Sequence, residues 1–276
     1  MNNRLDRQKR IKIYLDNNQR VHGWLHQYSA AFIADISELQ CENDIGGAVG
    51  EIGVHMGRLF ILLKLTAMDN ERCFALDVFC KQHLNIDSSG FGDRDTFLRN
   101  VRQWTGDADI TVMQASSLDV KASDIVDAVG QCRLVSIDGG HTEQLVCNDL
   151  QLIESVLIER GVIILDDFFN EAWPGVAAGA ARYFLDPSTN ARPFAITPNK
   201  VYLARPAHHE FYRKAIKKKQ QPFFEKTVRI FGNDVDIFGS RLSDRSFNQR
   251  RRRQMVKGKI VSTGRFARKL FKVVGR

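Results

Sequence analysis

Residues 134–141, Leu-Val-Ser-Ile-Asp-Gly-Gly-His, and residues 161–167, Gly-Val-Ile-Ile-Leu-Asp-Asp, decide the fold of this chain. Each stretch is a short apolar run that ends in acid, and runs rich in Val and Ile are typical of strands buried on both faces of a parallel sheet. Residues 145–160 between them have the length and apolar spacing of a helix. Together these segments predict a β-α-β unit, in which both strands are parallel and end at the same edge of the sheet.

Three carboxylates and one histidine follow these two strands. They are Asp138, His141, Asp166 and Asp167. We expect them to converge where open α/β sheets bind ligands. Carboxylates held this close repel one another unless a positive charge lies among them, so a divalent cation is the natural candidate. The alternative is that each strand-end aspartate only caps a helix.

A glycine turn marks the start of the same sheet. Residues 48–53 predict a short strand that runs into Glu51-x-Gly53-x-x-x-Gly57, and residues 58–66 continue as an apolar helix. Strand, glycine turn and helix form the geometry that brings backbone N–H groups close to a ligand. An ordinary strand–helix turn is the alternative interpretation.

The next predicted strand, residues 73–76, ends in Asp77, which lies 24 residues after Gly53. This is about the spacing at which an acid meets a ribose diol in nucleotide-binding folds. His55 stands where dinucleotide-binding proteins carry their second glycine, and this disfavours a nicotinamide-dependent reductase.

The remaining segments complete an α/β pattern, with a polar loop at residues 81–92 that we interpret as a candidate lid. Helices are expected over residues 1–20, 21–42, 94–104, 123–129 with Ser123 as cap, 177–185 and 208–219. Strands are expected over residues 110–113, with two hairpins over residues 193–204 and 228–238. We expect the helix at 21–42 to pack against the sheet edge or to cover the site.

Charge is distributed unevenly along the chain. The net charge is +8, yet residues 241–276 hold thirteen Lys or Arg and one acid, which leaves residues 1–240 with 27 basic and 31 acidic groups. The basicity therefore describes the tail and not the body. The five cysteines form no C-x-x-C pair, and the charged residues 1–10 lack an apolar signal core, so we expect a cytoplasmic protein.

The tail contains four consecutive arginines at residues 250–253. Beyond them Phe266, Leu270, Phe271 and Val274 fall on one face of a helical projection. A basic amphipathic helix is typical of contact with an anionic membrane surface, here the inner face. A solvated tail is the alternative, and attachment to nucleic acid is disfavoured. The sequence is also compatible with assembly of the protein into a homo-oligomer.

The order of these motifs resembles that of class I S-adenosylmethionine-dependent methyltransferases. The nearer likeness is to the metal-dependent O-methyltransferases that act on sugars of macrolides and aminocoumarins. It covers residues 47–205 and is carried by the Glu51–Gly57 turn, Asp138-Gly-Gly-His141 and Leu165-Asp166-Asp167. Residues 1–46 then form a helical segment before this domain, residues 206–240 an extension, and residues 241–276 the basic tail.

The resemblance implies a Rossmann-like, seven-stranded sheet flanked by helices. It also implies S-adenosylmethionine binding by Glu51, Gly53, Gly57, Asp77, Ser116, Ser117 and Asp138. Mg²⁺ would be held by Asp138, Asp166 and Asp167. His141 would act as general base, with Asp138 as the alternative base.

The predicted function is O-methylation of a sugar or glycan-like hydroxyl. The alternative is a catalytically inactive, methyltransferase-like binding protein that docks through its tail. The intact set of acids argues against this alternative.

Overall fold

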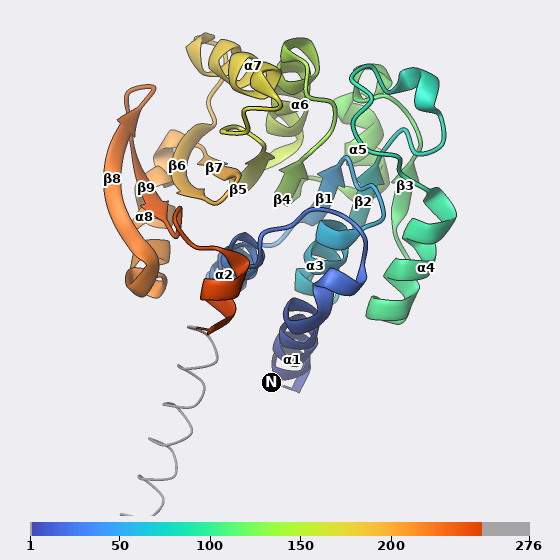
Figure 1. Ribbon diagram of the computed structural model, residues 1–276, viewed down its shortest axis with the longest axis horizontal. Coiled ribbons are helices and arrows are strands. Elements are labelled where there is room, and N and C mark those ends of the chain that lie inside the picture. Colours follow the sequence, from blue (N-terminus) through green and yellow to red (C-terminus); the bar gives the residue numbers. More distant parts are fainter. Residues whose placement is uncertain (1, 250–276) are drawn as a thin grey trace, which may run out of the picture. The chain divides into compact units, whose positions relative to one another are not determined.

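One nine-stranded sheet lies at the centre of the computed structural model, which describes residues 2–249 (Figure 1). The strand order is β3-β2-β1-β4-β5-β7-β6-β9-β8. The strands are β1 (Ala48–Ile52), β2 (Cys73–Leu76), β3 (Thr111–Met113), β4 (Cys132–Ile137), β5 (Leu157–Asp166), β6 (Arg192–Thr197), β7 (Lys200–Ala204), β8 (Phe224–Ile230) and β9 (Asn233–Phe238). The chain divides into two units, residues 1–240 and 241–276, and the sheet belongs to the first.

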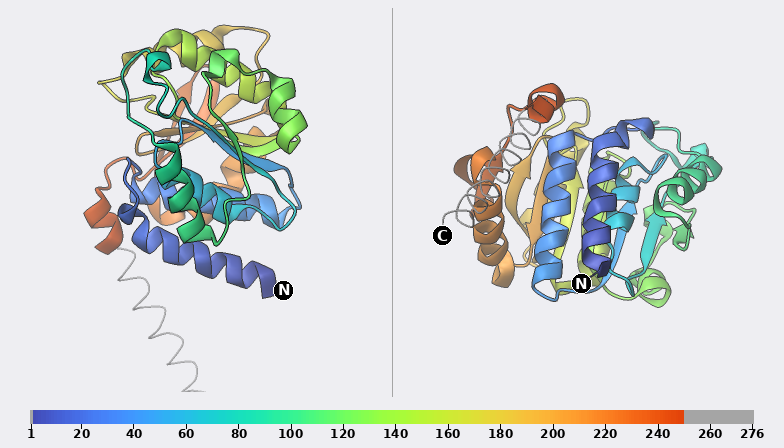
Figure 2. Two further views of the ribbon diagram at one scale, coloured as in Figure 1. Left: turned by 90° about the vertical axis from the view of Figure 1, so that its right-hand side faces the viewer. Right: turned by 90° about the horizontal axis from the view of Figure 1, so that it is seen from below.

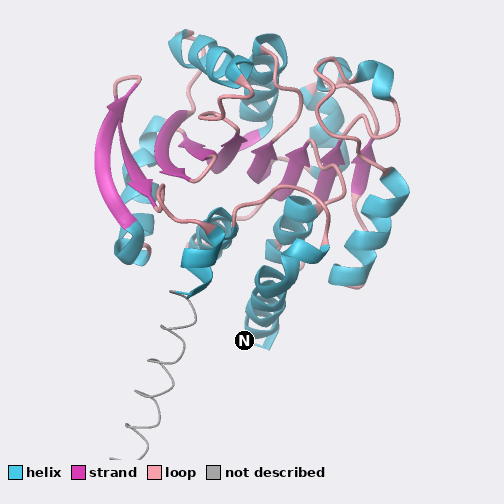
Figure 3. Ribbon diagram, in the orientation of Figure 1, coloured by secondary structure: helices cyan, strands magenta, loops and turns pink. Residues whose placement is uncertain are grey.

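The first five strands are parallel, which confirms the predicted α/β class (Figure 3). β7 runs antiparallel to both β5 and β6. The prediction of seven strands was too low, because β9 pairs with β6 through Ala195 opposite Asp236 and Ile196 opposite Ile237. An edge strand exposes unpaired N–H and C=O groups, and the β8–β9 hairpin satisfies those of β6.

The register of the parallel strands aligns their carboxyl ends at one edge of the sheet. Ile52 in β1 lies opposite Leu76 in β2 and Ile137 in β4, and Ile137 lies opposite Leu165 in β5. The residue after each of these positions is therefore at the same edge of the sheet. Because the apolar runs are buried on both faces, only these strand ends present polar groups to a ligand.

Helices cover both faces of the sheet (Figure 1). They are α1 (Asn2–Asn17), α2 (Gln27–Glu42), α3 (Arg58–Thr66), α4 (Arg94–Thr105), α5 (Ala122–Val129), α6 (Glu143–Val156), α7 (Pro174–Leu185) and α8 (Pro206–Lys219). α5, α6 and α7 pack together on one face, and the other helices lie on the opposite face. Figure 2 shows α1 and α2 side by side beneath the sheet.

The second helix differs from its prediction in two ways. α2 begins at Gln27 and not at residue 21, because the His26 ring accepts a hydrogen bond from the Tyr28 amide at 3.2 Å and caps the helix there. It also lies on the sheet face and not over the site. Its Ser29 hydroxyl donates to the Pro198 carbonyl at 2.7 Å, and Gln40 donates to the Arg133 carbonyl at 2.8 Å.

Two other boundaries differ. The helix predicted to reach residue 160 ends at Val156, because Leu157 already pairs with Cys132 and begins β5. α5 is capped at Lys121 and not at Ser123, since the Lys121 amide donates to the Asp124 carboxylate at 2.8 Å.

In the second unit, residues 244–249 are helical. The Ser243 hydroxyl accepts a hydrogen bond from the Ser246 amide at 3.2 Å at the start of this turn. The amphipathic segment predicted within residues 250–276 lies outside the described residues. Along residues 2–249, no helix is both long enough and apolar enough to cross a membrane.

Candidate active site

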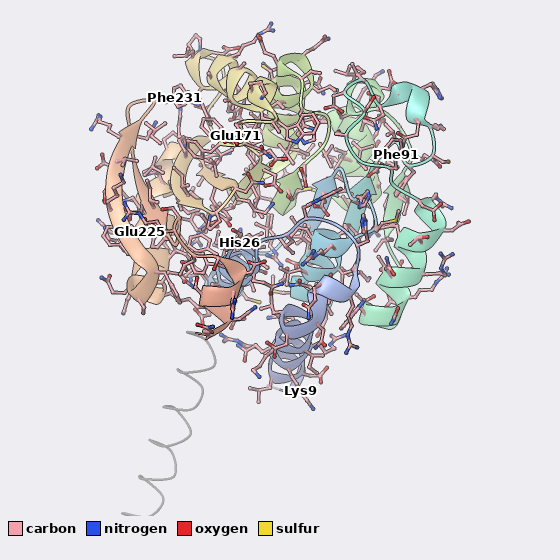
Figure 4. All side chains as sticks on the ribbon, viewed as in Figure 1. Lys9, His26, Phe91, Glu171, Glu225 and Phe231 are labelled. Carbon is pink, nitrogen blue, oxygen red and sulfur yellow. The ribbon has the colours of Figure 1, made fainter. Side chains whose placement is uncertain are left out.

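A cavity of about 370 Å³ opens at the carboxyl edge of the sheet, and we call it the edge pocket. Eight of the ten predicted site residues line it: Gly53, Asp77, Ser116, Ser117, Asp138, His141, Asp166 and Asp167. The loop after β2 and the loop between β5 and α7 border it, and the labels of Phe91 and Glu171 mark these loops in Figure 4. Glu51 and Gly57 are the two predicted residues outside its lining.

The turn after β1 has a shape that requires glycine. Gly53 has a φ of 83°, and a Cβ at this position would lie 1.8 Å from the Asp138 carbonyl oxygen. Gly57 has a φ of 90° and caps α3, where a Cβ would lie 2.9 Å from the Phe97 ring. Gly53 therefore allows the ends of β1 and β4 to approach each other beside the pocket. Gly57 lies outside the pocket lining and allows the start of α3 to pack against Phe97.

Asp77 is braced by this turn. Its carboxylate accepts hydrogen bonds from the His55 amide at 2.8 Å and from the Phe79 amide at 2.6 Å. Burial raises the pKa of Asp77 in spite of these donors. The side chain is thus fixed against the pocket wall, in the position where an acid is expected to meet a ribose.

Glu51 lies beneath the pocket and not in its wall. It is 2% exposed, and burial raises the pKa of its carboxyl well above the ordinary value, although Lys200 opposes the shift. Its Oε2 atom is buried without a hydrogen-bond partner among the described residues. Glu51 is therefore a further buried acid close to the cluster, and a direct contact to a cofactor does not follow from its position.

Lys200 is a buried cation that the sequence interpretation missed. It is 2% exposed, lies directly opposite Asp166 across the antiparallel β5–β7 pair, and forms an ion pair with that carboxylate. Burial lowers the pKa of Lys200, but the charges of Asp166, Asp138 and Glu51 raise it overall. The predicted hairpin did not reveal this contact, because it arises from the pairing of β7 with β5 and not from the pairing of β6 with β7.

Asp138 has no comparable partner. Among the described residues, none donates a hydrogen bond to its carboxylate, and 29% of its side chain is open to the pocket. The pKa of Asp138 is well above its ordinary value, because of its buried surroundings and then the charge of Asp166. This carboxylate would be stabilised in its charged form by a cation in the pocket.

Asp167 is held as an anion. It has a φ of 58°, and its Oδ1 atom accepts hydrogen bonds from Asn170 at 2.9 Å and Asn199 at 2.5 Å. Burial acts to raise the pKa of Asp167, but the hydrogen bonds from His141, Asn170 and Asn199 outweigh it and lower the pKa to about 2.

His141 lies between acids on both sides of its ring. Its Nε2 atom is 3.2 Å from Asp167 Oδ2 and 3.9 Å from Asp138 Oδ1, and its Nδ1 atom is 3.0 Å from Asp87 Oδ2. The ring stacks on Trp173 with centroids 4.3 Å apart. Burial acts to lower the pKa of His141, but Asp167 and Asp87 raise it overall.

The groups that could hold a metal differ in part from those predicted. Ligand atoms of Asp138, His141 and Asp167 all lie within 4.8 Å of one another. Asp166 also lines the pocket, but Lys200 and Asn199 engage its two oxygens. Asp166 is thus paired with a buried lysine, whereas neither Asp138 nor Asp167 is paired with a Lys or Arg side chain among the described residues.

Comparison with known proteins gives the same picture of the fold. Residues 51–168 match the family described as "Methyltransferase domain". The solved structure of the O-methyltransferase NovP is similar, with 15% identity, a TM-score of 0.53, and coverage of 64% of this chain and 79% of that chain. The O-methyltransferase from Bacillus cereus in complex with SAH has 14% identity, a TM-score of 0.51, and coverage of 71% and 91%. No curated protein matches the chain.

The match defines the class of this region: residues 51–168 form a methyltransferase domain. The fold agrees with that of the two O-methyltransferase structures. The class expected from the glycine turn and the aspartate motifs is confirmed.

Proposed function

We propose that the chain is an O-methyltransferase that acts on a hydroxyl of a sugar or glycan-like acceptor, with a divalent metal at Asp138 and Asp167. One observation carries the proposal: the carboxylates of Asp138 and Asp167 and the ring of His141 face the same pocket as the Gly53 turn and Asp77. A methyl donor held at one end of the pocket and an acceptor hydroxyl held at the other would then meet within it.

The cofactor end of the pocket comprises Gly53, Asp77, Ser116 and Ser117. Asp77 would accept hydrogen bonds from the two ribose hydroxyls of S-adenosylmethionine, and the two serines would lie beside the adenine. The backbone at Gly53 can approach the cofactor closely because that residue has no side chain. The positive sulfonium of the donor would also favour the acidic end of the pocket.

At the acceptor end, His141 would serve as the general base. In the reaction, the acceptor oxygen attacks the methyl carbon, the carbon–sulfur bond breaks to leave a neutral thioether, and the hydroxyl proton passes to His141 Nε2. A positioned base of this kind contributes about 10²–10⁴-fold to the rate.

The donor set fits a hard cation. Asp138 and Asp167 offer carboxylate oxygens, which Mg²⁺ prefers, and Asp138 has no hydrogen-bond donor of its own among the described residues. When bound, Mg²⁺ would lower the pKa of the acceptor hydroxyl and fix its orientation. His141 is near enough to be a third ligand, so its role as base needs a separate test.

The experiment is methyl transfer to candidate glycans, followed by intact-mass analysis, after EDTA treatment and again with Mg²⁺ restored. We expect activity to be lost and then recovered. Full activity in EDTA would mean that the acids contact the acceptor directly. Absence of turnover with every acceptor, in protein that still binds the cofactor, would favour the inactive binding protein.

Substitutions separate the two roles. Asp167→Asn keeps the shape of the side chain but loses its charge, so it should weaken metal binding and reduce turnover steeply while sparing cofactor affinity. His141→Ala should leave metal binding largely intact and reduce the chemical step by about 10²–10⁴-fold. If His141→Ala weakens metal binding as much as Asp167→Asn does, His141 is a ligand and Asp138 becomes the base. The exposed Asp127→Asn is a matched control for loss of one charge.

A further inference from the structure

The loop between β2 and α4 brings a carboxylate against the back of the His141 ring. Asp87 Oδ2 is 3.0 Å from His141 Nδ1, and the same oxygen accepts a hydrogen bond from the His141 backbone amide. The two side chains are 11% and 10% exposed, so water has little access to this contact. Asp87 lies 54 residues from His141 in the chain and does not belong to the motifs that carried the family resemblance.

The other oxygen of Asp87 is held by its own loop. Asp87 Oδ1 accepts hydrogen bonds from the Ser89 hydroxyl at 2.6 Å and the Ser89 amide at 3.1 Å. Asn85 closes the loop, since its amide group donates to the carbonyls of Ser89 and Gly90 at 3.0 and 3.1 Å. The carboxylate is therefore oriented before any ligand binds.

The remaining sides of the His141 ring are also defined. Its Nε2 atom points towards Asp167 and Asp138 at the pocket, and Trp173 stacks on one face. Two acids contact the ring, and each neutral tautomer donates to one of them: Nδ1–H to Asp87 and Nε2–H to Asp167. Asp87 also accepts from the His141 backbone amide, so it holds this residue at two atoms. The tautomer with its proton on Nδ1 is the one that directs the Nε2 lone pair into the pocket.

We propose that Asp87 is the positioning residue of His141, which fixes the Nδ1–H tautomer and the ring orientation so that Nε2 can accept the proton of the acceptor hydroxyl. This inference rests on the proposed role of His141 as base. Asp87 is not expected to touch the cofactor or the acceptor. Partners that orient a functional histidine in this way are generally worth about 10–100-fold in activity.

The same loop also borders the cofactor end of the pocket. A Cβ at Gly92 would lie 3.2 Å from Asp77 Oδ1, and Asn85, Ser89 and Gly90 line the pocket. A substitution at Asp87 could therefore act by disturbing the loop. A test must separate that effect from the effect on His141, and cofactor affinity is the readout that does so.

The first measurement is kinetic, on the full chain. Asp87→Ala should lower kcat by about 10–100-fold while the KM and the dissociation constant for S-adenosylmethionine stay within about twofold of wild type. Asp87→Asn keeps an acceptor oxygen of the same shape and should recover part of kcat. Asp127→Asn on α5 is exposed and should match wild type. A rise in both constants with unchanged kcat would assign Asp87 to the loop alone and overturn the proposal.

The second measurement is independent of turnover. The ¹⁵N chemical shifts of the His141 ring, assigned by the signals missing in His141→Gln, report the tautomer at a pH where the ring is neutral. We expect the Nδ1–H form in wild type and a shift towards the Nε2–H form, which donates to Asp167, in Asp87→Ala. Unchanged ring shifts in folded Asp87→Ala would overturn the proposal even if His141 is essential. A tautomer that depends on Asp87 in a protein without methyl transfer would support the positioning role and refute the proposed function.

Discussion

At the scale of single residues, Asp77 gives a direct test of the cofactor end of the pocket. Its carboxylate is already oriented by the His55 and Phe79 amides, so a ribose would meet a preorganised acceptor. Removing a charge-assisted contact to two hydroxyls should cost about 2–3 kcal/mol. Calorimetry with Asp77→Ala should then show an affinity for S-adenosylmethionine at least about thirty-fold lower than wild type.

The control for this measurement is Asp77→Asn, which keeps one oxygen for the backbone donors and the turn in place. It should lose less affinity than Asp77→Ala. Equal affinity in wild type and a folded Asp77→Ala would remove Asp77 from the binding site.

A second residue, Asp149 on α6, carries a pH dependence that concerns stability and not catalysis. It is fully buried, its Oδ2 atom has no hydrogen-bond partner among the described residues, and burial raises its pKa to about 6. The ordinary value is 3.8, so the unfolded chain releases this proton at lower pH than the folded protein does. The contribution of Asp149 to stability therefore falls as the pH rises from about 4 to about 6, and it stays low above that range.

The substitution Asp149→Asn removes this titration. Urea unfolding of wild type and variant should show the variant gaining about 1–3 kcal/mol relative to wild type between pH 4 and pH 7. The comparison between the two proteins cancels the titration of all other groups. Parallel stability curves across this range would show that Asp149 stays charged in the folded protein.

At the scale of elements, Arg133 ties strand β4 to the helices beneath it. The side chain is fully buried and donates to the Glu71 carboxylate at 2.7 and 2.8 Å, to Gln40 at 2.7 Å and to Ser37 at 3.0 Å. Glu71 follows α3, while Ser37 and Gln40 belong to α2. One guanidinium thus joins the sheet to two segments of the opposite layer.

Breaking this ion pair on one side leaves a buried charge without its partner. Glu71→Ala should therefore lower the free energy of unfolding by about 3–5 kcal/mol, as measured by urea titration. Replacing both partners, in the double variant Arg133→Met with Glu71→Leu, should restore much of the loss. The exposed pair of Arg10 and Asp6 is the control, and Asp6→Ala should change stability by less than about 1 kcal/mol. A loss at Glu71 no larger than the loss at Asp6 would contradict a structural role for the pair.

The elements also show what the sequence could predict. Strand ends that follow apolar runs, such as Asp138 and Asp166, were predicted to meet because parallel strands end at one edge. Lys200 and Asp87 were not predicted to reach this cluster. The contact of Lys200 depends on β7 entering between β5 and β6, and that of Asp87 depends on the path of a polar loop. Neither the order of β7 in the sheet nor the path of this loop produces a recognisable periodicity or motif spacing in the sequence.

At the scale of the whole molecule, the acidic pocket and the basic tail have separate sources of charge. The described tail residues, 241–249, belong to the second unit, and the arginine run at 250–253 follows them in the sequence. A mildly acidic body with a net charge of −4 gives no reason for attraction to anionic surfaces, whereas the tail carries +12. Any attraction to such a surface is therefore expected from the tail alone.

This leads to a prediction for membrane contact. The sequence of residues 250–276 combines clustered cations with Phe266, Leu270 and Phe271 on one helical projection, so both charge and apolar area would contribute to binding. Each cation near an anionic surface is worth about 1 kcal/mol, so replacing the four arginines at 250–253 with glutamine should reduce binding by at least about tenfold.

The measurement is co-sedimentation of the full chain with vesicles of anionic or of neutral lipid. Added salt should weaken binding of the wild type, because surface charges are screened within about 10 Å at 0.1 M ionic strength. Leu270→Asp with Phe271→Asp tests the apolar part separately, and equal recovery of wild type and both variants in the anionic pellet would show that the tail is only solvated.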